Sequence, residues 1–120
     1  MFTETSLRKI RDFSAVFPVV SLYLNTEPAK GNAETHRLRL RNMLKRLPLE
    51  KESQKIEEFF AYRYDWSGRA VDIFSCVPAN FFEFISLSVP VKDFNNITPK
   101  PQIKPLEDLL EEVNQLRFAL

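Results

Sequence analysis

Six basic side chains fall within seventeen residues of this chain, opposed by a single carboxylate at Glu34. At about 100° per residue, Arg37, Arg41 and Lys45 share one side of a predicted helix, whereas Arg39 and Arg46 lie on the other flank. A row of cations of this kind suits contact with phosphate groups, which position a nucleic acid without reading its sequence. The six residues are Lys30, Arg37, Arg39, Arg41, Lys45 and Arg46.

His36 is the only histidine and lies in the same segment. A metal site or a general base would need a second histidine or a carboxylate four residues away, but those positions are Asn32 and Leu40. We therefore expect His36 at the surface near the helix start, where its protonation would modulate binding. We add it to the six cations as a candidate RNA-binding residue.

A competing interpretation treats the basic segment as a solvated face that pairs with the acidic helix after it. Pro48 ends the basic helix, and the next helix is predicted with its carboxylates on the wet side. Those carboxylates are Glu50, Glu52, Glu57 and Glu58. The sequence leaves both interpretations open.

No arrangement of residues predicts catalysis, a metal or a cofactor. Cys76 is the single cysteine, so it forms no internal disulfide, and its apolar surroundings predict a small buried side chain. Two glycines are too few for a glycine-rich phosphate loop. Tyr62, Tyr64 and Trp66 could stack on bases, although a core edge and a turn anchor are the commoner explanation for such residues. We expect a protein that is not an enzyme and has no small-molecule substrate.

Composition places the chain among ordinary globular domains. Its 120 residues are 44% apolar and 28% charged, which fits one domain with a substantial core. The net charge of +1 means that any electrostatic attraction must be local. No signal peptide is visible, and no apolar stretch approaches the ~20 residues of a membrane span. We expect a cytoplasmic protein with no membrane partner.

Apolar periodicity predicts the elements that position the basic residues. Helices are expected before residue 13, at 33–47, at 49–62 and from Pro105 onward, and strands at 19–24, 69–77 and 81–89. The first strand has one apolar face and a second face that is only partly polar, so we expect it to be internal to its sheet, whereas the proline-rich segment 90–104 suits an edge. The three-residue turn at 78–80 predicts antiparallel pairing. Together these features predict an α/β (α+β) domain with a mixed, largely antiparallel sheet of about four strands and packed helices.

Four segments of the chain resemble a known family. They are VSLYLNTEPAKGN, RLRLRNML, GRAVDIFS and the P-x-x-K-P-L-x-x-L-L pattern at 101–110. They are similar to the N-terminal domain of the bacterial archaeo-eukaryotic release-factor-like proteins, which are relatives of the class-1 termination factor of archaea and eukaryotes. The resemblance covers nearly the whole chain. It implies a bacterial translation protein whose partners are the ribosome, ribosomal RNA or tRNA, and its own downstream domains.

Two departures from that family limit what the resemblance implies. The codon-reading tetrapeptide Asn-Ile-Lys-Ser is replaced by Asn32-Ala33-Glu34-Thr35, and residues 95–104 lack the second codon-reading element. The chain also lacks the Gly-Gly-Gln of the hydrolytic domain. We therefore expect a domain at 1–117 that faces the ribosome without reading stop codons, and the start of a truncated downstream domain at 118–120. The alternative is a non-catalytic domain that docks on downstream domains through its Phe-rich strand and proline-rich edge.

Overall fold

The computed structural model describes residues 4–109, with side chains described from Leu7 onward. Within this range the chain forms a four-stranded antiparallel sheet and four α-helices, the last of which occupies residues 104–109. The remaining elements are α1 (Glu4–Arg11), β1 (Val19–Asn25), η1 (Pro28–Lys30), α2 (Ala33–Lys45), α3 (Glu50–Tyr62), β2 (Ala70–Cys76), η2 (Val77–Ala79), β3 (Phe81–Leu87) and β4 (Phe94–Thr98).

The sheet has the strand order β3-β2-β1-β4. In β1, Leu22 faces Ile73 of β2 on one side and Asn95 of β4 on the other, so the strand is internal as predicted. β4 lies within the proline-rich segment and pairs with β1 alone, which confirms the predicted edge. Every strand pair in the described range is antiparallel, so the expected mixture of directions is absent from it.

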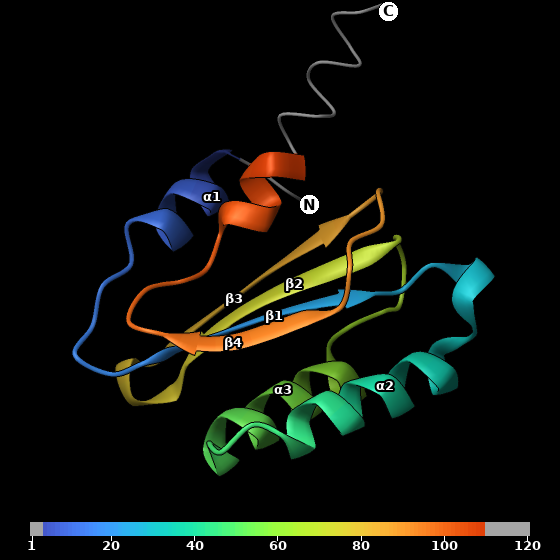
Figure 1. Ribbon diagram of the computed structural model, residues 1–120, viewed down its shortest axis with the longest axis horizontal. Coiled ribbons are helices and arrows are strands. Elements are labelled where there is room, and N and C mark those ends of the chain that lie inside the picture. Colours follow the sequence, from blue (N-terminus) through green and yellow to red (C-terminus); the bar gives the residue numbers. More distant parts are fainter. Residues whose placement is uncertain (1–3, 110–120) are drawn as a thin grey trace, which may run out of the picture.

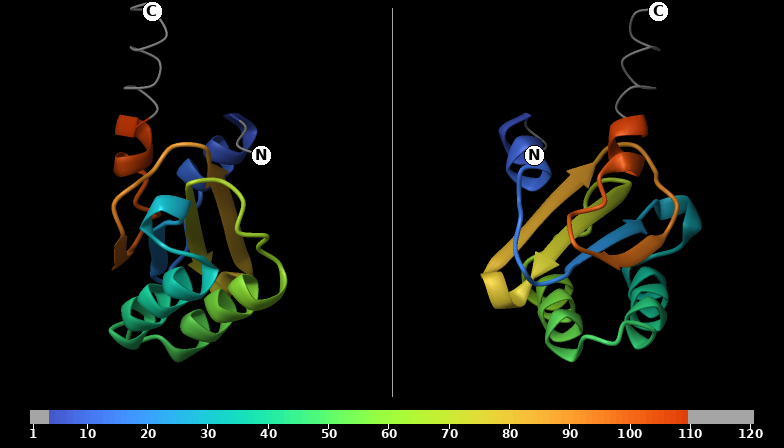
Figure 2. Two further views of the ribbon diagram at one scale, coloured as in Figure 1. Left: turned by 90° about the vertical axis from the view of Figure 1, so that its right-hand side faces the viewer. Right: turned by 60° about the vertical axis from the view of Figure 1, so that its left-hand side comes forward.

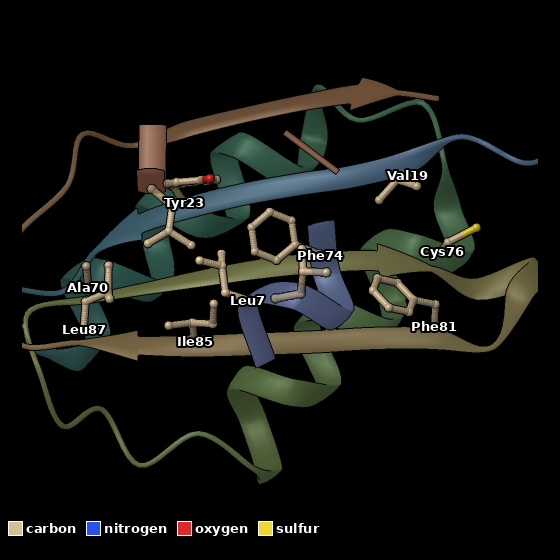
Figure 3. Packing of buried hydrophobic residues seen from close by; sticks show 11 residues of the cluster. Leu7, Val19, Tyr23, Ala70, Phe74, Cys76, Phe81, Ile85 and Leu87 are labelled. Carbon is tan, nitrogen blue, oxygen red and sulfur yellow. The ribbon is translucent and has the colours of Figure 1, made fainter. Parts of the chain in front are cut away.

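The sheet forms the middle of three layers (Figure 1). α1 and the helix at 104–109 cover one face, with Leu7, Ile10 and Leu106 buried against the strands. Phe13 follows the end of α1 and stacks on Phe81 with ring centroids 3.8 Å apart. Cys76 is buried in this layer, as predicted (Figure 3). The other strand residues of the hydrophobic core on this face of the sheet are Val19, Tyr23, Ala70, Phe74, Phe81, Ile85 and Leu87.

The opposite face of the sheet is covered by α2 and α3, which lie side by side (Figure 2). Leu40 and Leu44 of α2 pack against the β1 side, and a bond from the amide nitrogen of Asn95 to the Met43 carbonyl oxygen ties α2 to β4. Three apolar side chains of α3 complete the core: Ile56, Phe59 and Phe60. Burying each such side chain contributes roughly 1.5–3 kcal/mol.

The connection between β2 and β3 differs in detail from the predicted turn. Residues Val77–Ala79 form η2, and Asn80 then adopts a left-handed conformation with φ of 53°. Asparagine tolerates this region better than most residues because its short side chain bonds locally. The two strands pair antiparallel, as predicted. The predicted continuation of the last helix beyond residue 109 and the boundary at 117–118 lie outside the described residues.

Candidate nucleic-acid interface

α2 begins at a sharp change of chain direction. Gly31 has φ of 134°, a conformation that residues with a Cβ rarely adopt, and a Cβ there would lie 2.8 Å from Thr35. Asn32 then caps the helix, because its side-chain oxygen accepts a hydrogen bond of 2.9 Å from the Thr35 backbone N–H. These contacts fix the first turn of the helix that carries most of the predicted basic residues.

Three of the predicted cations form what we call the α2 basic face, namely Arg37, Arg41 and Lys45. All three are exposed, and successive members are about 6 Å apart along the helix axis. None of them makes an ion pair within residues 4–109. The face is therefore a row of exposed cations on one side of a rigid element.

Arg37 is held in place by an aromatic ring. Its guanidinium lies 5.3 Å from the centroid of the Trp66 ring, and that ring stacks on His36 at 6.2 Å. Cation–π contacts of this kind contribute about 0.5–1 kcal/mol at exposed sites. A hollow of about 630 Å³ beside the helix is lined by Arg37 and Arg41 together with Asn32, Glu34, Thr35 and Leu38.

Arg39 points away from the α2 basic face. Its guanidinium is ion-paired with Asp93, donates to the Asn25 carbonyl oxygen at 2.6 Å, and contacts Nδ1 of His36. It thereby joins the end of β1 to the segment before β4. Its position indicates a structural role, and it does not lie with the three cations of the α2 basic face.

His36 is only 2% exposed, so the prediction of a surface histidine was wrong. Its Nε2 lies 3.1 Å from the Glu27 carbonyl oxygen. Because a carbonyl oxygen only accepts, Nε2 carries the proton and Nδ1 is the acceptor for Arg39. Burial, and next the charge of Arg39, lower the pKa of His36 below its ordinary value. The residue belongs to the core of the β1–α2 connection and presents no group to a ligand.

The remaining predicted cations lie at the two ends of α2. Lys30 is exposed at the end of η1, and Arg46 is exposed immediately after the helix. Lys30 lines a groove of about 490 Å³ that also contains Arg39 and Lys92. The other residues of this groove are Asn25, Pro90, Val91 and Asp93.

The acidic helix neutralises the basic segment only in part. Glu57 lines a hollow of about 210 Å³ with Arg37 and Arg41, yet no carboxylate of α3 is ion-paired to α2 within the described range. Glu52 was predicted on the wet side, and this was wrong. It is 3% exposed and binds the Ser75 hydroxyl and the Val77 backbone N–H.

The three aromatic residues after α3 have different environments. Tyr64 is buried, and its hydroxyl donates to the Ser67 carbonyl oxygen at 2.7 Å. Trp66 is partly buried under Arg37, whereas Tyr62 is 86% exposed. Tyr64 and Trp66 are therefore the core edge and turn anchor that the sequence allowed.

Sequence reasoning missed a second group of cations and rings. Lys55 of α3 and Arg63, the residue that follows α3, lie above the Phe82 ring of β3, with Lys55 Nζ 5.9 Å from the Phe82 centroid. Lys55 is exposed on α3, Arg63 is exposed just after its end, and alternation places Phe82 and Phe84 on one face of β3. No sequence signal shows that these two surfaces meet.

The described residues hold no group of three or more His, Cys, Asp or Glu side chains arranged to bind a metal ion. Across the same part of the chain, no helix has the length and apolar character needed to cross a membrane. A scan against protein-family models and a search of curated proteins both find no match for this sequence.

Proposed function

We propose that this domain is a non-catalytic RNA-binding module that contacts phosphates through the α2 basic face. The observation that carries the proposal is the contrast within one helix. Arg39 forms an ion pair with Asp93, whereas Arg41 and Lys45 are exposed and make no ion pair within residues 4–109. Cations that stabilise nothing in the described fold are available to neutralise a partner.

The resemblance to release-factor-like proteins identifies the ribosome as the RNA partner to test first. In this proposal the domain positions the protein on ribosomal RNA or tRNA and does not read the codon. Contact is made with the phosphate backbone, so the affinity depends strongly on salt and weakly on sequence.

The test compares the wild-type chain with Arg41→Gln/Lys45→Gln in binding to purified ribosomes and to a short RNA duplex across a salt series. We expect the wild type to bind both. We expect the variant to bind more weakly, with the slope of log affinity against log salt reduced by roughly 1–2. Both side chains are exposed, so circular dichroism and thermal unfolding should change little.

A matched control removes two exposed charges elsewhere. Arg8→Gln/Lys100→Gln changes the net charge equally, and neither residue forms an ion pair in the described range. It should bind like the wild type. Equal affinity and equal salt slope for the two double variants would show that the α2 basic face is not the interface.

Protein docking through the Phe-rich strand is the second candidate function. Phe81 is 9% exposed and stacked on Phe13, so the first ring of that strand is unavailable. Phe84 is exposed, which is the observation that favours docking at this strand. A single exposed ring flanked by cations is a small apolar surface for a protein partner, and we rank this function below RNA binding.

A further inference from the structure

A second surface with the character of a nucleic-acid contact lies where α3 crosses the edge strand β3. We call it the α3–β3 patch and define it by Lys55, Arg63, Phe82 and Phe84. The Arg63 guanidinium lies 5.9 Å from the Phe82 centroid and 5.7 Å from that of Phe59. The buried Phe59 ring supports both β3 rings from beneath, at 5.4 Å from Phe82 and 4.7 Å from Phe84.

The rings of the patch are partly open to solvent. Phe84 is 39% exposed, and Phe82 is partly buried. Because they are two residues apart in β3, Phe82 and Phe84 lie on one face of the strand, and their Cα atoms are about 7 Å apart. β3 pairs with β2 on one side only within the described sheet, so this flank of the molecule is not covered by another strand.

The cations of the patch are unpaired within residues 4–109. Lys55 and Arg63 are exposed and make no ion pair in that range. Their described contacts are with aromatic rings. The patch thus combines π-faces with positive charge.

We propose that the α3–β3 patch binds a single-stranded stretch of RNA, with an unpaired base stacked on Phe84 and its phosphates on Lys55 and Arg63. This inference rests on the proposed RNA-binding function and adds that the RNA bound at this patch is single-stranded. Unpaired bases expose faces that stack on aromatic side chains, whereas the bases of a duplex do not. The α2 basic face needs only phosphates and is expected to accept either form.

The test measures binding of labelled single-stranded RNA of roughly ten nucleotides and of a labelled duplex to the full chain carrying Phe84→Leu. Leucine keeps an apolar contact with Phe59 and removes the stacking surface. We expect single-strand binding to weaken about tenfold and duplex binding to stay within about twofold of the wild type. Phe17→Leu is the matched control, because Phe17 is 44% exposed and its carbonyl oxygen faces Cys76 on the α1 side of the sheet.

A second variant keeps the test decisive if Phe84→Leu lowers the melting temperature. Lys55→Gln/Arg63→Gln should reduce the salt slope for single-stranded RNA by about 1 and leave the duplex slope unchanged. If neither variant weakens single-strand binding, while Arg41→Gln/Lys45→Gln weakens duplex binding, this inference fails and the proposed function stands. If the wild type binds neither RNA, the proposed function itself fails. Tighter binding of a labelled oligoglutamate than of either RNA would replace this inference with a protein partner.

Discussion

Asp72 occupies a buried environment that disfavours the ionised form of its carboxyl group. The side chain is fully buried, and neither carboxyl oxygen has a hydrogen-bond partner among the described residues. Its neighbours across the sheet are Tyr23 and Ile85. Burial raises the pKa of Asp72 to about 8, so the group is largely protonated at neutral pH. Leaving such a group without a partner costs roughly 1–3 kcal/mol.

We predict that Asp72 makes the domain less stable as pH rises. The unfolded carboxyl ionises near pH 4 and the folded one near pH 8. Between these values the folded chain holds one more proton than the unfolded chain, so its free energy of unfolding falls by up to about 1.4 kcal/mol per pH unit. Above pH 8 both states are ionised, and this contribution becomes constant.

Urea unfolding of the wild type and Asp72→Asn at pH 5 and pH 8 measures the effect. The wild type should lose more stability than Asp72→Asn over this interval. Asp12→Asn, at an exposed carboxyl, should follow the wild type. Parallel pH dependence in the wild type and Asp72→Asn would contradict the assigned environment.

The buried polar residues show where sequence reasoning fails at the scale of single residues. His36 lies four positions before Leu40, and Glu52 lies four positions before Ile56, so each extends an apolar stripe by one turn. A prediction of burial based on helical spacing, and not on side-chain polarity, would have placed both residues in the core. Asp72 stands in a strand whose neighbours are all apolar or small, but the lack of a partner depends on tertiary contacts that no local pattern reveals.

At the scale of elements, Glu52 attaches α3 to the end of β2. One carboxylate oxygen accepts from the Ser75 hydroxyl at 2.6 Å, and the other accepts from the Val77 backbone N–H at 2.8 Å. Val77 begins η2, which carries the chain into β3. Glu52 therefore connects a helix to the turn of the hairpin that it covers.

We predict that Glu52→Ala lowers the free energy of unfolding by about 2–3 kcal/mol, because the buried Ser75 hydroxyl and the partly buried Val77 N–H lose their acceptor. Chemical denaturation monitored by circular dichroism gives the value. Glu58→Ala on the exposed side of the same helix should change stability by less than about 0.5 kcal/mol. Similar losses in both variants would mean that helix propensity, not this attachment, determines the effect.

Elements with a strong periodic pattern were predicted closely. The alternation of 81–89 assigned Ile85 and Leu87 to one face and Phe82 to the other, and the two sheet faces divide these residues in that way. The basic helix was expected to reach residue 47 and ends at Lys45. The α3–β3 patch could not be anticipated, because it depends on which helix covers which strand.

At the scale of the whole molecule, the two helical layers differ in how firmly they hold the sheet. α1 has eight residues, and its described buried side chains are Leu7 and Ile10, whereas α3 alone buries four. β1 is buried along its full length and paired on both sides. We therefore expect α1 to open locally while the sheet stays folded.

Hydrogen exchange measured by mass spectrometry tests whether α1 opens before the sheet. Amides of α1 should exchange more than about tenfold faster than those of β1, with α3 between them. Equal protection of α1 and β1 would mean that the three layers open as one cooperative unit.

The strand order also has a consequence during translation. β1 leaves the ribosome before the other three strands, but the Tyr23 hydroxyl donates to the Gln102 carbonyl oxygen, which lies 79 positions later in the chain. At roughly 5–20 residues per second, the nascent β1 waits several seconds for the rest of the sheet. During that interval an apolar segment with unpaired backbone groups is open to misassociation with other nascent chains. α2 and α3 cover only one of its faces, and the helix at 104–109, which covers the other face together with α1, is made after every strand. This domain is therefore a candidate for chaperone contact before its synthesis is complete.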